Sequence, residues 1–409
     1  MVGPDSYEFC ELWRQYRNCR RNKRNTLNAF AFEIDAEANL IALQRELREH
    51  TYQPGRSVCF ITEGSKPREV FAADFRDRIV HHLLVSYQGR VFEPIFIHDS
   101  FACRRGKGTL AASDRLMEFL RRVTANGRRG VWALKLDVAS FFASIHKDTL
   151  YRLIAARMRH PELLWLTRVV LFHDPTTDYR YRSGPMPSYT RVTRHFHDPA
   201  AGYRYRRAVA IALREGAHQG RPGTTRYPVP AQKSLFGKQN ERGLPIGNLT
   251  SQFWANVYLN ELDQFVKRRL RCRYYVRYVD DSVLLSMDPG ELERMRDEIT
   301  GFLGDHLRLK LRVEDEQPRP VSRGIDFVGW ETWWNRRLPR RRTLGNFRTR
   351  LEAFERAAVR RVTARGVNRT DMSGAVRGVH GGAAVRIGLH SANAVACVER
   401  RPQLTVTPR

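Results

Sequence analysis

The sequence predicts an α/β (α+β) fold in which short strands and amphipathic helices share a hydrophobic core. Apolar runs on both sides of residues 278–281 alternate in the pattern that is typical of a β-hairpin. Residues 131–136 form a short apolar run of the kind found in a buried strand, and several longer segments have helical periodicity. With 409 residues and a hydrophobic content of 42%, the chain is long enough for two or three packed units.

Helix signals dominate the N-terminal region. Residues 6–28 predict a basic helix, and Asp35 can cap a second helix that Pro54 ends. Residues 56–73 predict two strands joined by a basic turn. The remaining predicted elements are helices at 74–97 and after the basic loop at 99–109, a strand at 131–136, helices from Lys147 and at 251–270, the hairpin around 278–281, a helix at 290–304, a strand at 324–330, and a basic segment from Trp333 that is helical to about Ala364. We assign no structure to the last 40 residues, which are rich in Gly and Ala.

One segment of the chain is duplicated. Phe-His-Asp-Pro followed by Tyr-Arg-Tyr-Arg occurs at 172–182 and again at 196–206, a period of 24 residues. Two copies are too few for a repeat architecture, so we expect a surface insertion at about 172–236. A nucleic-acid contact and a passively tolerated duplication both explain it.

Basic residues far outnumber acidic ones. The chain has 71 Lys and Arg against 43 Asp and Glu, a formal net charge of +28. This excess repels itself in a compact fold, and a bound polyanion relieves the repulsion while releasing its counterions. Aromatic residues lie among the basic ones, as at 14–17 and 203–206, which suits phosphate contact combined with base stacking. Because we find no clear basic amphipathic helix for a membrane surface, the composition favours nucleic acid.

The sequence argues against three other classes of protein. No apolar run approaches the length of a bilayer span. The N-terminus lacks the basic start and apolar stretch of a signal peptide. The six cysteines are scattered without a Cys-x-x-Cys pair, which argues against a zinc site and a secreted disulfide framework. We therefore expect a cytoplasmic protein with no membrane partner.

Two adjacent carboxylates occupy the predicted hairpin. Asp280 and Asp281 repel each other at the end of an apolar hairpin, and a divalent cation such as Mg²⁺, which prefers oxygen ligands, resolves that repulsion. A third carboxylate, Asp137, follows the predicted strand at 131–136. Together they could hold two metal ions for in-line attack on a phosphate. The alternatives are an ordinary Asp-Asp turn and, for Asp137, a helix N-cap.

The order of these segments resembles the palm of a reverse transcriptase. The joint match extends over about residues 40–335 and implies a right-hand polymerase with fingers, an antiparallel-sheet palm and a short helical thumb. The segments that carry the resemblance are the loop at 99–109, Lys-Leu-Asp-Val-Ala-Ser-Phe-Phe at 135–142, the template- and nucleotide-positioning motif Gly-Leu-Pro-Ile-Gly-Asn-Leu-Thr-Ser-Gln at 243–252, Tyr-Val-Asp-Asp at 278–281, and the primer-grip-like Gly-Ile-Asp-Phe-Val-Gly at 324–329.

The resemblance implies a domain order and a reaction. The reaction would be template-directed deoxynucleotidyl transfer, with template RNA, a primer or cDNA, and dNTPs as partners. The implied parts are an N-terminal basic helical extension at 1–55, fingers at 56–130, a palm at 131–335 that contains the insertion at about 172–236, and a thumb with a basic tail at 336–409.

The resemblance also implies roles for individual residues. Asp137 and Asp280 would bind two Mg²⁺ ions, or Mn²⁺, while Asp281 would support them and the Val138 carbonyl would complete one shell. The residues implied to bind the nucleotide are Lys66, Arg68, Phe142, Ile246, Gly247 and Gln252, and those implied to bind template or primer are Arg78, Arg105, Lys107, Tyr278 and Gly329.

Alternatives exist for some of these assignments. Phe142 lies where the family places a bulky side chain against a ribose 2′-hydroxyl, which implies deoxynucleotide substrates, but plain core packing also explains it. Arg105 and Lys107 could equally belong to a solvated basic loop. The family usually has a lysine after the hairpin that protonates pyrophosphate. Although Lys310 and Arg312 lie in the matching region, we assign this role to no residue.

The positioning motif departs from the common pattern. Most reverse transcriptases carry Gln-Gly-x-x-x-Ser-Pro, whereas this chain has Ile246 in place of the first Gln and Gln252 in place of Pro. This form resembles the error-prone enzymes of diversity-generating retroelements, which work with a small helical accessory protein and a structured RNA. The alternatives are an antiphage defence reverse transcriptase that copies a dedicated noncoding RNA and a catalytically silent, maturase-like RNA-binding scaffold.

Overall fold

The fold is a mixture of helices and sheets, as the sequence predicts. The computed structural model describes residues 7–21, 27–62, 67–181, 229–238, 240–312 and 317–363. The chain divides into two compact units. The first comprises Met1–Cys103, Leu136–Arg273 and Arg294–Glu316, and the second comprises Arg104–Lys135, Tyr274–Glu293 and Gln317–Arg409.

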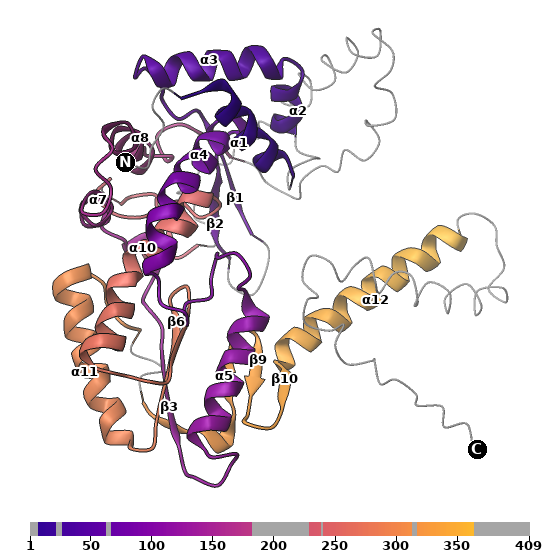
Figure 1. The fold of residues 1–409 in the computed structure, drawn as a ribbon. Coiled ribbons are helices and arrows are strands. Elements are labelled where there is room, and N and C mark those ends of the chain that lie inside the picture. The colour runs from indigo at the N-terminus through magenta and orange to yellow at the C-terminus, as the bar shows by residue number, and fades with distance from the viewer. Residues whose placement is uncertain are drawn as a thin grey trace, which may run out of the picture. The chain divides into compact units, whose positions relative to one another are not determined.

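Helices make up most of the first unit (Figure 1). The central one is α4 (Phe75–Phe92), which packs against α1 (Phe9–Arg21) and α10 (Leu249–Gln264) and buries residues around most of its circumference. Asp74 caps α4 by accepting a hydrogen bond from the backbone amide of Arg76 at 3.1 Å. The other helices are α2 (Leu27–Glu33), α3 (Ala36–Arg48), η1 (Glu93–Ile95), α6 (Phe141–Ser144), α7 (Lys147–Ala155), α8 (Pro161–Phe172), η2 (Ala231–Lys233), the π-helical η3 (Phe265–Arg269), and α11 (Pro289–Leu307) from Arg294 onward.

A three-stranded sheet in the same unit uses the first copy of the duplicated segment. The predicted strand pair is confirmed as β1 (Ser57–Ile61) and β2 (Glu69–Ala72), which are antiparallel. Strand β4 (Tyr179–Tyr181) lies parallel to β1 on its other side. Arg56 and Asp178 form an ion pair of 2.5 Å next to this pairing. The first copy therefore has a structural role, while the second copy lies outside the described residues.

The second unit contains two sheets. The four-stranded sheet has the order β5-β6-β3-β7, with β3 (Trp132–Leu136) belonging to this unit as far as Lys135. Its inner strands are buried, because Leu134 and Leu284 are 0% exposed. The other strands of this sheet are β5 (Tyr275–Tyr278), β6 (Asp281–Ser286) and β7 (Arg319–Pro320).

The smaller sheet of the second unit corrects one prediction. Residues 324–330 do not form one strand, because a tight turn at Val328 and Gly329 separates β8 (Ile325–Phe327) from β9 (Trp330–Thr332). Both turn residues have positive φ, 46° and 93°, as two-residue hairpin turns often require. Strand β10 (Arg337–Pro339) completes this sheet, α5 (Thr109–Val123) packs against β5 and β9, and α12 (Arg341–Thr363) follows (Figure 1).

Among the helices within the described ranges, none combines the length and the apolar composition that crossing a bilayer would require.

Candidate active site

The acidic hairpin of the second unit is confirmed. Strands β5 and β6 pair in a register that places Tyr278 opposite Asp281, so Val279 and Asp280 form the two-residue tip. Val279 has a φ of 56°, which is an unfavourable conformation for a β-branched residue. Arg277 is only 1% exposed, and its Nη1 donates to the Val279 carbonyl at 2.8 Å. This bond satisfies the carbonyl of the strained residue and holds the tip in place.

A lysine from the neighbouring strand faces the hairpin. Strand β3 lies beside β6 in the sheet, and Lys135 Nζ is 3.3 Å from Asp281 Oδ1. Both side chains are about a quarter exposed, at 27% and 28%. Lys135 therefore offsets part of the negative charge of the acidic pair.

The third carboxylate, Asp137, follows β3 directly and belongs to the first unit. Arg312 donates its backbone N–H to the Asp137 carbonyl at 2.8 Å, and its Nη1 is 2.6 Å from Asp137 Oδ2. Val138, which is 3% exposed, forms an antiparallel bridge with Leu311. Short backbone pairing thus fixes the segment that carries Arg312 beside Asp137.

The donor chemistry of these residues suits Mg²⁺. Within the part of the chain that the structure describes, no three His, Cys, Asp or Glu side chains gather as a metal site. Carboxylate oxygens are nevertheless the ligands that Mg²⁺ prefers. Asp137 and Asp281 each already face a protein cation, so both positions attract positive charge.

Sequence reasoning did not pair the three cations Lys135, Arg277 and Arg312 with their partners at the site. Each lies within or close to a motif that the sequence analysis identified, but only the strand register brings it to its partner. For Lys135, the only sequence signal of such a role was its place two residues before Asp137, on the same predicted strand.

The positioning motif at 243–252 contacts strand β2. Phe71 donates its backbone N–H to the Ile246 carbonyl at 2.9 Å, and Ala73 donates its own to Asn248 Oδ1 at 3.2 Å. Gly247 has a φ of 118°, and a Cβ there would lie 2.7 Å from Val70 Cγ1. The motif therefore reaches β2 by a close backbone approach that requires glycine. Gln252 is exposed in the first turn of α10.

Phe142 is half-buried in the same unit. Its ring lies edge-on to that of Phe141, with 5.4 Å between centroids, and its carbonyl accepts the N–H of Leu244 at 2.8 Å. These contacts fix its position relative to the positioning motif. Its role toward a ribose stays a prediction.

The cationic residues predicted to bind phosphates differ in exposure. Lys66 lies outside the described residues, and Arg68 is exposed immediately before β2. Arg78 is half-buried, and its Nε donates to the Ala73 carbonyl at 2.8 Å, which gives it a structural contact. In the second unit, Arg105 is exposed and Lys107 is half-buried, in a loop where Gly106 and Gly108 have positive φ.

Two further predicted residues occupy turns. Tyr278 is half-buried at the closing pair of the acidic hairpin, and Gly329 occupies the β8–β9 turn. Their contacts with template or primer stay predictions.

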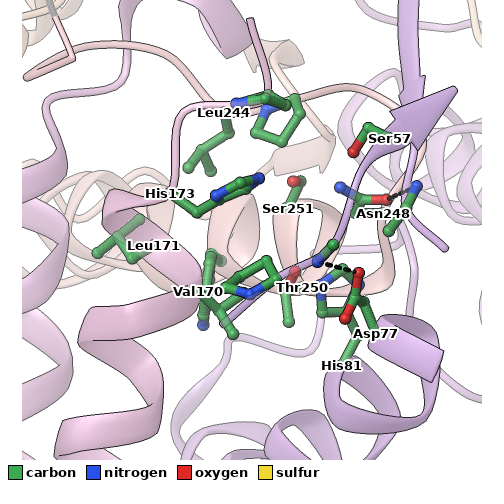
Figure 2. A pocket seen from close by; sticks show the side chains of 16 residues that line it. Ser57, Asp77, His81, Val170, Leu171, His173, Leu244, Asn248, Thr250 and Ser251 are labelled. Atoms are coloured by element: carbon green, nitrogen blue, oxygen red, sulfur yellow. Dashed lines mark hydrogen bonds between the residues drawn. The ribbon is translucent and has the colours of Figure 1, made fainter. Parts of the chain in front are cut away.

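A small pocket lies in the first unit, between α4, the end of α8 and the start of α10 (Figure 2). Its free volume is about 20 Å³, which is room for about one water molecule and too little for a nucleotide. Asp77 lines it and accepts hydrogen bonds from Tyr52 Oη and the Gly55 N–H, both at 2.9 Å. Burial raises the pKa of Asp77 to about 6. Two imidazoles of the lining, His81 and His173, each have a buried nitrogen without a hydrogen-bond partner.

His81 is expected to make the fold sensitive to acid. Burial, followed by the nearby Arg78, lowers the pKa of His81 from 6.5 to about 3, so the unfolded chain takes up this proton and the folded chain does not. The stability that neutral His81 contributes is complete above pH 6.5 and falls as the pH drops toward 3. At pH 5 the loss is about 2 kcal/mol in the free energy of unfolding. His81→Gln should remove it in urea unfolding measured at pH 7 and pH 5.

The pH dependence of unfolding must be compared between wild type and variant, because Asp77 changes it in the opposite direction. The raised pKa of Asp77 adds stability to the fold as the pH falls below 6. The same change at the exposed His306 serves as a control. Equal pH dependence of unfolding for wild type and His81→Gln would contradict this prediction.

Comparisons with known proteins give distant similarities. No family model matches the chain. Over 245 residues it is 23% identical to the "Uncharacterized 91 kDa protein in cob intron" of Schizosaccharomyces pombe, covering 60% of this chain and 22% of that protein. It is 22% identical over 340 residues to "Protein YkfC" of Escherichia coli, covering 74% of this chain and 73% of that protein. An apo telomerase structure from Candida tropicalis aligns with a TM-score of 0.41 and 10% identity, covering 70% of this chain and 56% of that one. The chain thus spans about a fifth of the length of the Schizosaccharomyces relative.

Proposed function

We propose that this protein is an RNA-directed DNA polymerase. The observation that supports the proposal most directly is the position of β3 beside β6 in the four-stranded sheet. Strand β6 begins with Asp281, strand β3 ends immediately before Asp137, and Lys135 of β3 reaches Asp281. An acidic hairpin beside a strand that carries a lysine, in a chain with a third carboxylate at Asp137, suits two-metal phosphoryl transfer.

The three carboxylates are the proposed metal ligands. Asp137 and Asp280 would hold two Mg²⁺ ions, for which Mn²⁺ could substitute, and the Val138 carbonyl would complete one shell. When bound, the ions would activate the primer 3′-hydroxyl and neutralise the triphosphate of the incoming nucleotide. Asp281, which Lys135 already partly neutralises, would be the weaker ligand.

Residues of the first unit would select and hold the nucleotide. Arg68 and Lys66 would bind the triphosphate, because forked or mobile cations suit phosphate oxygens. Phe142 would exclude the ribose 2′-hydroxyl and so restrict the substrate to dNTPs. The Gly247 backbone and Gln252 belong to the positioning motif, which the hydrogen bond from Phe71 to Ile246 ties to β2.

The excess of basic residues would help to hold template and primer. A formal net charge of +28 favours binding to the phosphates of a nucleic acid, whatever its nucleotide sequence. The exposed Arg105 and the neighbouring Lys107 would contact the template backbone. Arg78, Tyr278 and Gly329 are proposed template or primer contacts from the sequence resemblance.

Primer extension on an RNA template tests the proposal. The full-length protein, given a DNA primer annealed to RNA, Mg²⁺ and dNTPs, is expected to synthesise cDNA. Excess EDTA should abolish synthesis, because without metal ions the negatively charged carboxylates repel the triphosphate and nothing activates the primer 3′-hydroxyl. Replacement of dNTPs by rNTPs should reduce product strongly. Binding of the primer–template without incorporation, with Mg²⁺ or with Mn²⁺, would contradict the proposal.

The proposed biological role is error-prone cDNA synthesis in a diversity-generating retroelement. Ile246 stands where an amide could hydrogen-bond the nucleotide sugar or the template, and loss of such a polar check weakens discrimination between nucleotides. A structured RNA and a small helical accessory protein would be the partners. A neighbouring variable-protein gene with an adenine-rich template repeat would support this role, whereas a surrounding cluster of defence genes would contradict it.

A further inference from the structure

The carboxylate of Asp137 is ion-paired with the guanidinium of Arg312. The two side chains form an ion pair of 2.6 Å, in which Asp137 is 21% exposed and Arg312 is 30% exposed. This pair is therefore more shielded from water than a typical surface ion pair, so its attraction is less screened.

The backbone fixes Arg312 independently of this ion pair. Its N–H donates to the Asp137 carbonyl at 2.8 Å, and two residues earlier the Lys310 carbonyl accepts the N–H of Ala139 at 2.9 Å. Between them Val138 and Leu311 form an antiparallel bridge. The guanidinium is consequently delivered to Asp137 by strand-like pairing and stays nearby when the ion pair opens.

Proton transfer is not a role that Arg312 can fill. A guanidinium remains protonated in proteins, so it cannot act as the general acid that protonates pyrophosphate. What it can do is supply a fixed positive charge beside the carboxylate, with donors aimed at the oxygen that a metal would also use.

We propose that Arg312 is the resident counter-ion of Asp137 and that a divalent metal ion must displace it. The inference rests on the proposed function, in which Asp137 is a metal ligand. The guanidinium nitrogen, 2.6 Å from Oδ2, occupies a position that a Mg²⁺ ion at roughly 2.1 Å from the same oxygen would use, and its positive charge repels a metal ion bound at either oxygen of Asp137. Arg312 thus keeps the partly buried carboxylate neutralised without metal, and it weakens metal binding by the free energy needed to open the pair.

Direct measurement of metal binding tests this inference. Mn²⁺ is titrated into the full-length protein without nucleotide or nucleic acid, and free Mn²⁺ is followed by electron paramagnetic resonance. Arg312→Gln removes the competing charge and should tighten Mn²⁺ binding roughly fivefold, the value expected for the loss of a single ion pair of this kind. Arg312→Met, which keeps an apolar stem of similar length, should do the same.

Lys310→Gln is the matched control. Lys310 lies in the same segment and carries the same charge, but its side chain is exposed and its backbone carbonyl makes the contact to Ala139. Its Mn²⁺ affinity should stay within about twofold of wild type, because a solvent-exposed charge is largely screened.

Each outcome has a definite reading. Tighter binding in both Arg312 variants and an unchanged Lys310→Gln support the inference. Equal or weaker binding in the Arg312 variants overturns it, while primer extension by the wild type would leave the polymerase proposal standing. Absence of Mn²⁺ binding in every protein overturns both the inference and the proposed metal centre.

Discussion

Asp280→Asn is expected to reduce RNA-templated primer extension by on the order of a thousandfold or more. Asparagine keeps the size of the side chain and removes the negative charge that a shared metal ion needs. Asp280 occupies the two-residue tip of the hairpin, where Arg277 fixes the backbone through Val279. The substitution should therefore leave the fold unchanged, and the loss should appear in the rate of single-nucleotide incorporation.

Two related variants make the result specific. Asp281→Asn should cost less, about tenfold to a hundredfold, because Lys135 already shares this carboxylate and its metal role is the supporting one. Asp297→Asn, at a surface position that is 69% exposed on α11, should leave the rate unchanged. All three proteins should bind the RNA–DNA primer–template equally well.

The same experiment separates an enzyme from a silent RNA-binding scaffold. A scaffold would show equal binding and the same trace of product for wild type and Asp280→Asn. An enzyme would show equal binding and very different product. Retention of full wild-type activity by Asp280→Asn would refute the metal role of this carboxylate.

Local sequence patterns were sufficient for most of the elements around the proposed site. The β5–β6 hairpin and β3 could be predicted because each is short, apolar and bounded by polar residues. The strand expected at 324–330 was wrong, since its alternation of residues continues through a turn in which Val328 adopts a positive φ. Gly329 is compatible with a turn, but Val328 gave no indication of one, because valine rarely adopts a positive φ.

Long-range pairing could not be predicted in the same way. The parallel pairing of β4 with β1 joins the duplicated segment to a strand far away in the sequence. The ion pair of Arg312 with Asp137 depends on the Val138–Leu311 bridge, and that of Lys135 with Asp281 depends on the β3–β6 register. Sequence alone identified the three carboxylates as candidates, whereas their cationic partners follow from the fold.

Gly247→Ala is expected to destabilise the first unit by roughly 2–5 kcal/mol, the sum of a positive-φ backbone penalty and an overpacking cost. Gly247 has a φ of 118°, and an added Cβ would lie 2.7 Å from Val70 Cγ1 and 3.2 Å from the Phe71 carbonyl oxygen. The valine side chain can rotate, but the carbonyl belongs to β2 and can move only with its strand. The motif must therefore withdraw from β2 and lose the 2.9 Å hydrogen bond between Phe71 and Ile246.

This withdrawal couples stability to nucleotide binding, which is why the variant is informative. If the positioning motif acts on the nucleotide through its fixed distance from β2, Gly247→Ala should lower the thermal midpoint by several degrees and raise the KM for dNTPs in the folded fraction. Gly301→Ala is the control, because Gly301 lies exposed in α11 with open space around it and alanine favours a helix. That variant should be slightly stabilised and fully active. An unchanged thermal midpoint in Gly247→Ala would show that the loop tolerates a side chain here. A lowered midpoint with an unchanged KM would separate the packing role of Gly247 from any role in nucleotide positioning.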